Sequence, residues 1–188
     1  MNSFEQLFFL KDIPMILFFF IIYAFFGWLL ENSYNFITKR RFFKPNFFLG
    51  PFKPMYGFAP LLLVFFIKPE TNWVVVIFLC FFIPTFVEYV SGALLEKFFH
   101  QKWWDYSDLP LQIHGHICLS FSLCWIALSL ICIHFIHPGI VFLYGFVSSA
   151  WGLVWPIVSI YLLVEFILAI KKHSFQSQLV EKHTKPIQ

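Results

Sequence analysis

The sequence predicts an all-α integral membrane protein with about five transmembrane helices. Of its 188 residues, 60% are hydrophobic and only 12% are charged, and the mean hydropathy is +0.76. A soluble domain has about a quarter of its residues charged, so the chain has too little polar surface to cover a globule in water, and lipid is its expected solvent. Backbone groups in lipid must be satisfied within the segment, which makes helices the expected spanning elements.

Five apolar runs are candidate spans, since a helix needs about 20 apolar residues to cross a membrane. They cover roughly residues 13–37, 55–68, 72–95, 117–136 and 140–170. The first lacks a small-residue cleavage site after it and is expected to be a retained span. The second is short. The fifth is long for one crossing and contains Pro156, so it is either one kinked span or two short segments.

Lysine and arginine are divided unevenly between the two predicted sides of the membrane. Eleven of the thirteen follow the first span, the third span or the fifth span, and the other side has only Lys11 and Lys68. Short loops rich in lysine and arginine stay cytoplasmic. The N-terminus is therefore predicted outside and the C-terminus in the cytoplasm of a multi-pass cell-membrane protein. Residues 1–172 form a single transmembrane domain, and residues 173–188 form a short polar cytoplasmic tail.

Charged side chains within spans are costly and often mark functional sites. Glu31, Glu88, Glu96 and Glu165 lie within or at the ends of predicted spans, all in the half expected to face the cytoplasm. We expect Glu31, Glu88 and Glu96 to line one cytoplasm-facing cavity. The alternative is that glutamates at the span ends only extend to the membrane interface.

A five-residue pattern occurs twice, as GWLLE from Gly27 to Glu31 and as GALLE from Gly92 to Glu96. The spacing of four places each glycine and its glutamate on one helix row. A glycine at this position lets a neighbouring segment approach closely. The repeat is compatible with a parallel duplication of a two-span unit. Short leucine-rich sequences also recur by chance.

The loop after the first span is rich in proline and phenylalanine. Its four prolines exclude an ordinary helix through it; they are Pro45, Pro51, Pro54 and Pro60. The segment is too apolar for a solvated loop, so we expect extended or re-entrant backbone covered by protein, with Tyr56 opening the second span. Arg40 and Arg41 either set the topology, bind a phosphate or pair with a glutamate.

The stretch HQKWWDYSD, residues 100–108, lies between two predicted spans. Its aromatic residues suit an anchor at the headgroup level. Anchoring explains Asp105 less well, and we expect this carboxylate to pair with Lys102 or with Arg40 and Arg41.

Several classes of function are disfavoured. The sequence has no P-loop and no GxSxG motif, so neither ATP hydrolysis by that route nor serine nucleophile chemistry is expected. The basic residues have no soluble platform for nucleic acid. The four cysteines lie in apolar runs, and the histidines around Glu96 are a weak zinc pattern. No metal site or cofactor is predicted.

Longer motifs give the chain a family resemblance. They are FFGWLLE at 25–31, the arginine pair after the first span, FLGPFKPMYG at 48–57, the glutamate of VEY at 87–89, LLEKFFHQKWWDYS at 94–107 and G-x-ICLSFSLCW at 115–125. With these motifs the chain resembles the bacterial family of ABC-transporter type IV permeases over most of its first 125 residues. It departs from the family pattern at Asn46 and Phe47, and at His114 and His116 beside Gly115.

The resemblance implies the permease subunit of a membrane transporter, with a cytoplasm-facing cavity of acidic and basic groups. The predicted substrate-binding residues are Glu31, Glu88, Glu96, Arg40, Arg41, Asp105 and Tyr56. A separate cytoplasmic ATPase is expected to dock on the loops at 38–53 and 97–116. The alternatives are a membrane enzyme acting on a lipid or lipid-linked substrate at the cytoplasmic face, and a non-catalytic membrane partner protein. A role other than catalysis is favoured, while the substrate and the oligomeric state stay open.

Overall fold

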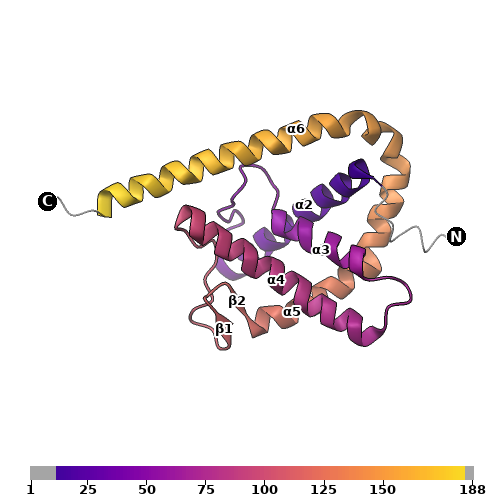
Figure 1. Cartoon of the computed structure of the whole chain (residues 1–188), viewed down its shortest axis with the longest axis horizontal. Coiled ribbons are helices and arrows are strands. Elements are labelled where there is room, and N and C mark those ends of the chain that lie inside the picture. The colour runs from indigo at the N-terminus through magenta and orange to yellow at the C-terminus, as the bar shows by residue number, and fades with distance from the viewer. Residues whose placement is uncertain (1–11, 185–188) are drawn as a thin grey trace.

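The computed structural model describes residues 12–184, and they are mainly helical (Figure 1). The helices are α2 (Ile13–Lys39), α3 (Pro54–Phe66), α4 (Trp73–Phe99), α5 (Leu119–Ile131), the π-helix η1 (Cys132–Ile136) and α6 (His137–Thr184). A short antiparallel hairpin, β1 (Gln112–Ile113) and β2 (Ile117–Cys118), precedes α5. Each of the five predicted apolar runs is mainly helical. Within residues 12–184, three helical stretches are long and apolar enough to cross a membrane: Ile13–Lys39, Trp73–Phe99 and Leu119–Leu179.

The two long early helices begin and end with recognisable capping residues. Asp12 accepts a hydrogen bond from the Met15 N–H at 2.9 Å, and Asn72 accepts one from the Val74 N–H at 2.8 Å. These side chains satisfy backbone donors that the first turn leaves open. Both helices end at a left-handed residue, Arg40 with φ 55° and His100 with φ 51°. The chain therefore turns sharply into the two polar loops that follow.

The fourth and fifth predicted apolar runs are joined by continuous helix. The sequence places a break around His137, Pro138 and Gly139, but the helix continues from α5 through η1 into α6. The π-helical turn just before Pro138 gives a physical reason, because its wider hydrogen-bond pattern accommodates a residue that has no N–H. His137 is fully buried and lies 2.6 Å from the Tyr23 hydroxyl. This polar side chain is thus satisfied inside the bundle.

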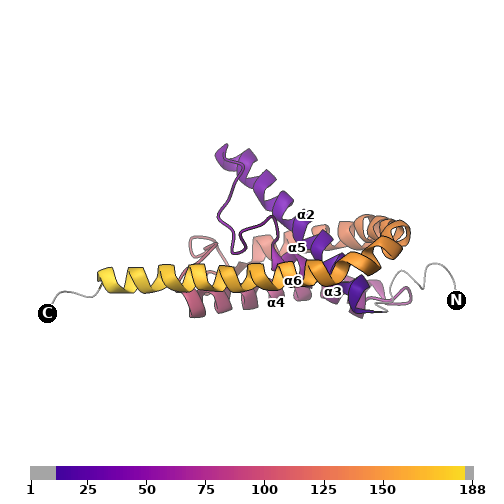
Figure 2. The same cartoon turned by 90° about the horizontal axis from the view of Figure 1, so that it is seen from above.

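The connecting loops and helix ends gather at two opposite ends of the molecule. Figures 1 and 2 show residues 40–53, residues 100–118 and the far end of α6 toward one end. The start of α2, the turn at 67–72 and the bend in the orange part of α6 lie toward the other. α6 also continues through most of the predicted polar tail, to Thr184.

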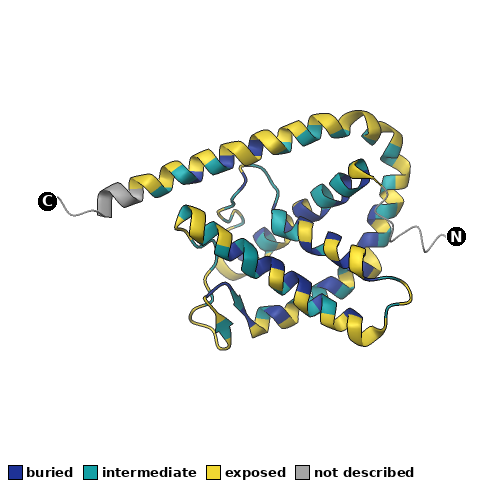
Figure 3. Ribbon diagram, viewed as in Figure 1, coloured by how far each residue is buried: buried dark blue, intermediate teal, exposed yellow. Residues whose placement is uncertain are grey.

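The core lies around α2 and α3, whose close approach depends on two glycines. A Cβ atom at Gly27 would overlap the ring of Tyr56, and one at Gly57 would come within 2.5 Å of the ring of Phe20. Buried apolar side chains such as Phe19 and Leu63 fill the space around this contact. The outer surfaces expose many large apolar side chains, and Figure 3 shows most of α6 exposed. Such a surface fits contact with lipid.

Candidate functional site

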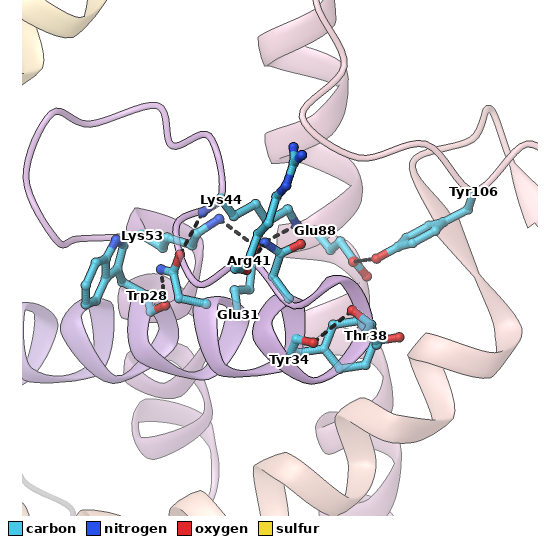
Figure 4. Close-up of polar contacts among 11 residues, drawn as sticks. Trp28, Glu31, Tyr34, Thr38, Arg41, Lys44, Lys53, Glu88 and Tyr106 are labelled. Carbon is cyan, nitrogen blue, oxygen red and sulfur yellow. Dashed lines mark hydrogen bonds and ion pairs between the residues drawn. The ribbon is translucent and has the colours of Figure 1, made fainter.

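Glu31 lies at the centre of a cluster of charges on α2. Its Oε2 atom is 2.8 Å from Lys44 Nζ and 2.6 Å from Lys53 Nζ, and the Glu31 side chain is only 15% exposed (Figure 4). Burial lowers the pKa of Lys53, while the neighbouring carboxylate of Glu31 acts in the opposite direction. A buried carboxylate with two lysine partners is electrostatically compensated.

The loop at 40–53 folds back over α2 and so delivers these lysines. Buried Asn32 accepts a hydrogen bond from the Lys44 N–H at 2.8 Å and donates to the Trp28 carbonyl at 2.7 Å. Asn35 donates to the Arg41 carbonyl at 2.6 Å. The Lys53 N–H reaches the Ala24 carbonyl at 3.0 Å. As the sequence predicted, the segment from Arg41 to Lys53 is irregular, and it is partly covered by protein.

Glu88 lies inside the bundle on α4 and is 3% exposed. Tyr106 donates its hydroxyl to Oε1 at 3.0 Å, and Trp125 donates its indole N–H to Oε2 at 2.8 Å. The Tyr106 contact is visible in Figure 4. Burial and the Glu88 carboxylate raise the pKa of Tyr106, which keeps this hydroxyl protonated as a donor. No basic side chain in the described part of the chain forms an ion pair with Glu88.

Tyr56 lies between the two buried glutamates at the start of α3. It is within electrostatic reach of both Glu31 and Glu88. Its ring packs on Trp125 with 5.4 Å between centroids, and it also contacts Gly27. The structure therefore brings three predicted site residues together, namely Glu31, Glu88 and Tyr56. We call these three, with Lys44, Lys53, Tyr106 and Trp125, the buried polar cluster.

Glu96 belongs to a separate and more exposed group. Its carboxylate is 3.1 Å from His116 Nε2 and 3.9 Å from Lys102 Nζ, and its side chain is 46% exposed. Lys102 also lies 3.5 Å from Asp105, which was one of the two pairings predicted for that residue. Ser107 donates two hydrogen bonds to Asp105, which lowers the pKa of the Asp105 carboxyl. We call Glu96, Lys102, Asp105 and His116 the hairpin charge group.

The two histidines of the hairpin region are held by contacts within the protein. Nε2 of His116 faces Glu96, and its Nδ1 would lie 2.9 Å from a Cβ atom at Gly92, so both ring nitrogens point into the protein. His114 lies instead beside the Tyr89 hydroxyl, at 3.0 Å. Within residues 12–184 there is no group of three or more side chains arranged to hold a metal ion.

Arg40 and Arg41 lie outside both groups of charges. Both are exposed, and Figure 4 shows the Arg41 side chain extending away from Glu31. Neither forms an ion pair with an acidic residue in the part of the chain that is described. Of the roles that the sequence left open for these arginines, the described residues do not show pairing with a glutamate. Lys44 and Lys53 take that place because Asn32 and Asn35 fold the loop back onto α2.

Glu165 connects α6 to the irregular loop. It accepts a hydrogen bond from the Gly50 N–H. About two helical turns later on α6, His173 Nε2 lies 3.0 Å from the Phe47 carbonyl oxygen. Glu165, Ala169 and His173 are spaced four apart and are all buried, so they form the stripe by which α6 contacts the loop. Glu165 is thus a contact between segments, away from the other glutamates.

Two cavities adjoin the buried polar cluster. One of about 360 Å³ lies between α2, α3, α4 and α5. Tyr56 and Trp125 line it, whereas Glu31 and Glu88 do not, so these two aromatic side chains separate the cavity from the carboxylates. The second, of about 510 Å³, lies between the end of α4, the irregular loop and α6, with Lys53 in its lining. Both are lined mainly by apolar side chains.

Comparison with known proteins identifies the family. The family model described as "Putative ABC-transporter type IV" matches residues 18–170. The chain belongs to this family. The match covers the whole buried polar cluster and the hairpin charge group, and with the apolar helices it indicates a transporter-related membrane protein. No curated protein and no solved structure gave a match.

Four members of the buried polar cluster were not predicted as site residues: Lys44, Lys53, Tyr106 and Trp125. The lysines were counted only for orientation, and Tyr106 was interpreted as an interfacial anchor. A signal was present in the motifs, because FLGPFKPMYG contains Lys53 and the WWDYS block contains Tyr106. Their partners are 22 and 18 residues away in sequence, respectively. Such long-range pairings are not visible in local spacing.

Proposed function

We propose that this protein is the permease-type subunit of a membrane transporter and that solute passes the buried polar cluster. The observation that carries the proposal is the convergence of Glu31 and Glu88 on Tyr56, inside the helix bundle and beside irregular backbone. Ionisable groups within spans are costly and are typical of substrate pathways. Broken helices and irregular backbone occur at transporter binding sites for the same reason.

The two glutamates suggest different roles in binding. Lys44 and Lys53 already balance Glu31, whereas only the neutral donors Tyr106 and Trp125 contact Glu88. Glu88 is thus the buried acid without an ion-pair partner among the described residues, and its carboxylate form would favour a solute that is cationic or rich in hydrogen-bond donors. For passage, Tyr56 and Trp125 would move aside and join the 360 Å³ cavity to the carboxylates.

We further propose five crossings, with the N-terminus outside and the C-terminus in the cytoplasm. α2, α4 and the long part of α6 run toward the end that holds residues 40–53, and α3 and α5 run away from it (Figure 1). The apolar stretch Leu119–Leu179 has 61 residues. A straight helix of this length would measure roughly 90 Å, about three times the hydrocarbon thickness. The bend in α6 allows it to supply two crossings, and the lysine-rich loops then face the cytoplasm.

A separate ATPase is the proposed source of energy, because the sequence has no P-loop. The loops at 38–53 and 97–116 are the proposed docking surface. They lie toward the same end of the molecule, and they carry the exposed Arg40 and Arg41 on one side and Asp105 on the other. The family description is consistent with such a partner.

Copurification tests this function. The tagged full-length chain would be extracted from its native membranes in a mild detergent, and its partners would be identified and assayed for ATP hydrolysis. We expect a stoichiometric ATPase that is lost when Arg40 and Arg41 are both changed to Glu. The same change at Lys171 and Lys172, which lie outside both loops, is the matched control and should retain it. A folded, pure preparation without an ATPase would contradict the proposal.

A further inference from the structure

The 510 Å³ cavity has no role in the proposed transport pathway, which involves the 360 Å³ cavity. It lies between the last turns of α4, the irregular loop and α6. Aromatic and aliphatic side chains form most of its wall: Phe47, Leu94, Phe98, Trp103, Phe166 and Ile170. A few polar residues, among them Ser91 and Ser174, complete the lining. Its size is within the range of about 300–1,000 Å³ that is typical of ligand sites.

Two lysines border this wall and form no ion pair with an acidic residue within the described part of the chain. The Nζ atom of Lys97 is 5.9 Å from the centroid of the Phe98 ring, which is part of the wall. Lys171 lies three residues before Ser174 on α6 and so flanks the row of side chains that line the cavity. Both lysines are exposed.

Of the acidic residues on the same two helices, Glu96 pairs with His116 and Lys102, and Glu165 is buried and accepts the Gly50 N–H with one oxygen. The exposed edge of the cavity formed by α4 and α6 therefore carries positive charge, while its lining is mainly apolar. An amphiphile with an acyl chain and an anionic head matches both parts.

We propose that this cavity binds an anionic phospholipid of the surrounding leaflet. An acyl chain lies against Phe98, Trp103 and Ile170, and the phosphate lies by Lys97 and Lys171. The lipid then fills the space between α4 and α6, which otherwise meet through the contact of Phe99 with His173 and through the loop at 46–52 and Trp103. A bound lipid would thus hold α6 against the bundle. This site requires only that the chain lies in a membrane and is independent of the transport proposal.

Native mass spectrometry tests the site on the full chain. The protein would be reconstituted in equal amounts of phosphatidylglycerol and phosphatidylcholine, extracted in mild detergent and analysed for retained lipid. We expect retention of phosphatidylglycerol over phosphatidylcholine. Changing Lys97 and Lys171 to Gln should lower this preference by about fivefold for each lysine removed. The matched control changes Arg40 and Arg41 to Gln, which removes the same charge from the same end, and should leave the preference intact.

A second variant tests the apolar part of the cavity. Ser91→Trp places an indole in the lining and should displace the retained lipid, with folding monitored by size-exclusion chromatography. The lysine variants are on the surface and stay informative if Ser91→Trp does not fold. Equal retention of the two lipids, or an equal loss in the control variant, would overturn the proposal. An unchanged phosphatidylglycerol preference in the lysine variant would also overturn it.

Discussion

The two copies of the Gly-x-Leu-Leu-Glu pattern end in very different surroundings. Glu31, in the copy on α2, is 15% exposed, with two lysines within 2.8 Å. Glu96, in the copy on α4, is 46% exposed and is shared between His116 and Lys102. In both copies the glycine one turn earlier receives a bulky neighbour. In both copies the glycine allows a close contact with another segment, and the glutamate lies one turn further along the helix. The fold of the loop after each helix determines whether that glutamate is buried.

The largest difference is expected from the lysine partners. Lys53→Met removes one of the two cations from buried Glu31 and should lower the free energy of unfolding by about 3–5 kcal/mol. Lys102→Met, the equivalent change beside Glu96, should cost less than about 1 kcal/mol, because that pair is partly exposed. Chemical denaturation in detergent measures both. Equal losses would show that the two copies are energetically alike.

The glycines give the next test. A methyl group at Gly27 overlaps the Tyr56 ring, whereas at Gly92 it would lie 2.9 Å from His116 and 3.2 Å from Trp104. Gly27→Ala should therefore cost about 2–3 kcal/mol, since α2 and α3 must separate. Gly92→Ala should cost about 1 kcal/mol, because the hairpin loop can shift. Thermal unfolding of the two variants ranks them, and a larger effect at Gly92 would reverse the comparison.

Tyrosine hydroxyls provide a smaller and paired test. Tyr106→Phe leaves one oxygen of buried Glu88 without its donor and should cost about 1–3 kcal/mol. Tyr89→Phe removes an exposed contact to His114 and should cost about 0.5 kcal/mol or less. The two changes are matched because each removes one hydroxyl group, from Tyr106 in the loop after α4 and from Tyr89 within α4. Similar unfolding temperatures for the two variants would argue that Glu88 does not depend on Tyr106.

The smallest effect is expected at Glu96 itself. Glu96→Gln removes the charge from a half-exposed group, and exposed pairs contribute roughly 0–1 kcal/mol. The variant should unfold within a few tenths of a kcal/mol of the wild type in a denaturant titration. A loss of several kcal/mol would show that the hairpin charge group is a structural centre of the fold.

Local sequence properties predicted the helices well but not the continuity of the fourth and fifth apolar runs. Runs of apolar residues marked every helix, and proline correctly excluded a helix from most of residues 40–53. The His-Pro-Gly stretch at 137–139 is typical of a turn, but burial of His137 against Tyr23 kept the chain helical. Sequence patterns indicate only local conformational preference. They do not show that the hydroxyl of Tyr23, 114 residues away, forms a hydrogen bond with buried His137.

The candidate site was predicted in part for a similar reason. Glu31, Glu88 and Tyr56 were identified because charge in a span and proline-broken backbone are unusual in themselves. Their partners are ordinary loop residues whose role depends on how the loop folds. Asn32 holds Lys44 in place, and Tyr106 reaches Glu88 from a loop built around Gly115, with φ +74°. These contacts arise from tertiary structure alone.

The central claim is that the buried polar cluster serves transport, whereas the hairpin charge group does not. The most direct measurement is ATP hydrolysis by the copurified complex, with the unfolding temperature recorded on the same preparations of wild type, Glu88→Gln and Glu96→Gln. The account predicts that Glu88→Gln lowers turnover by about tenfold while the protein stays folded, and that Glu96→Gln changes turnover little. Full turnover in a folded Glu88→Gln complex, or equal losses in the two variants, would contradict it.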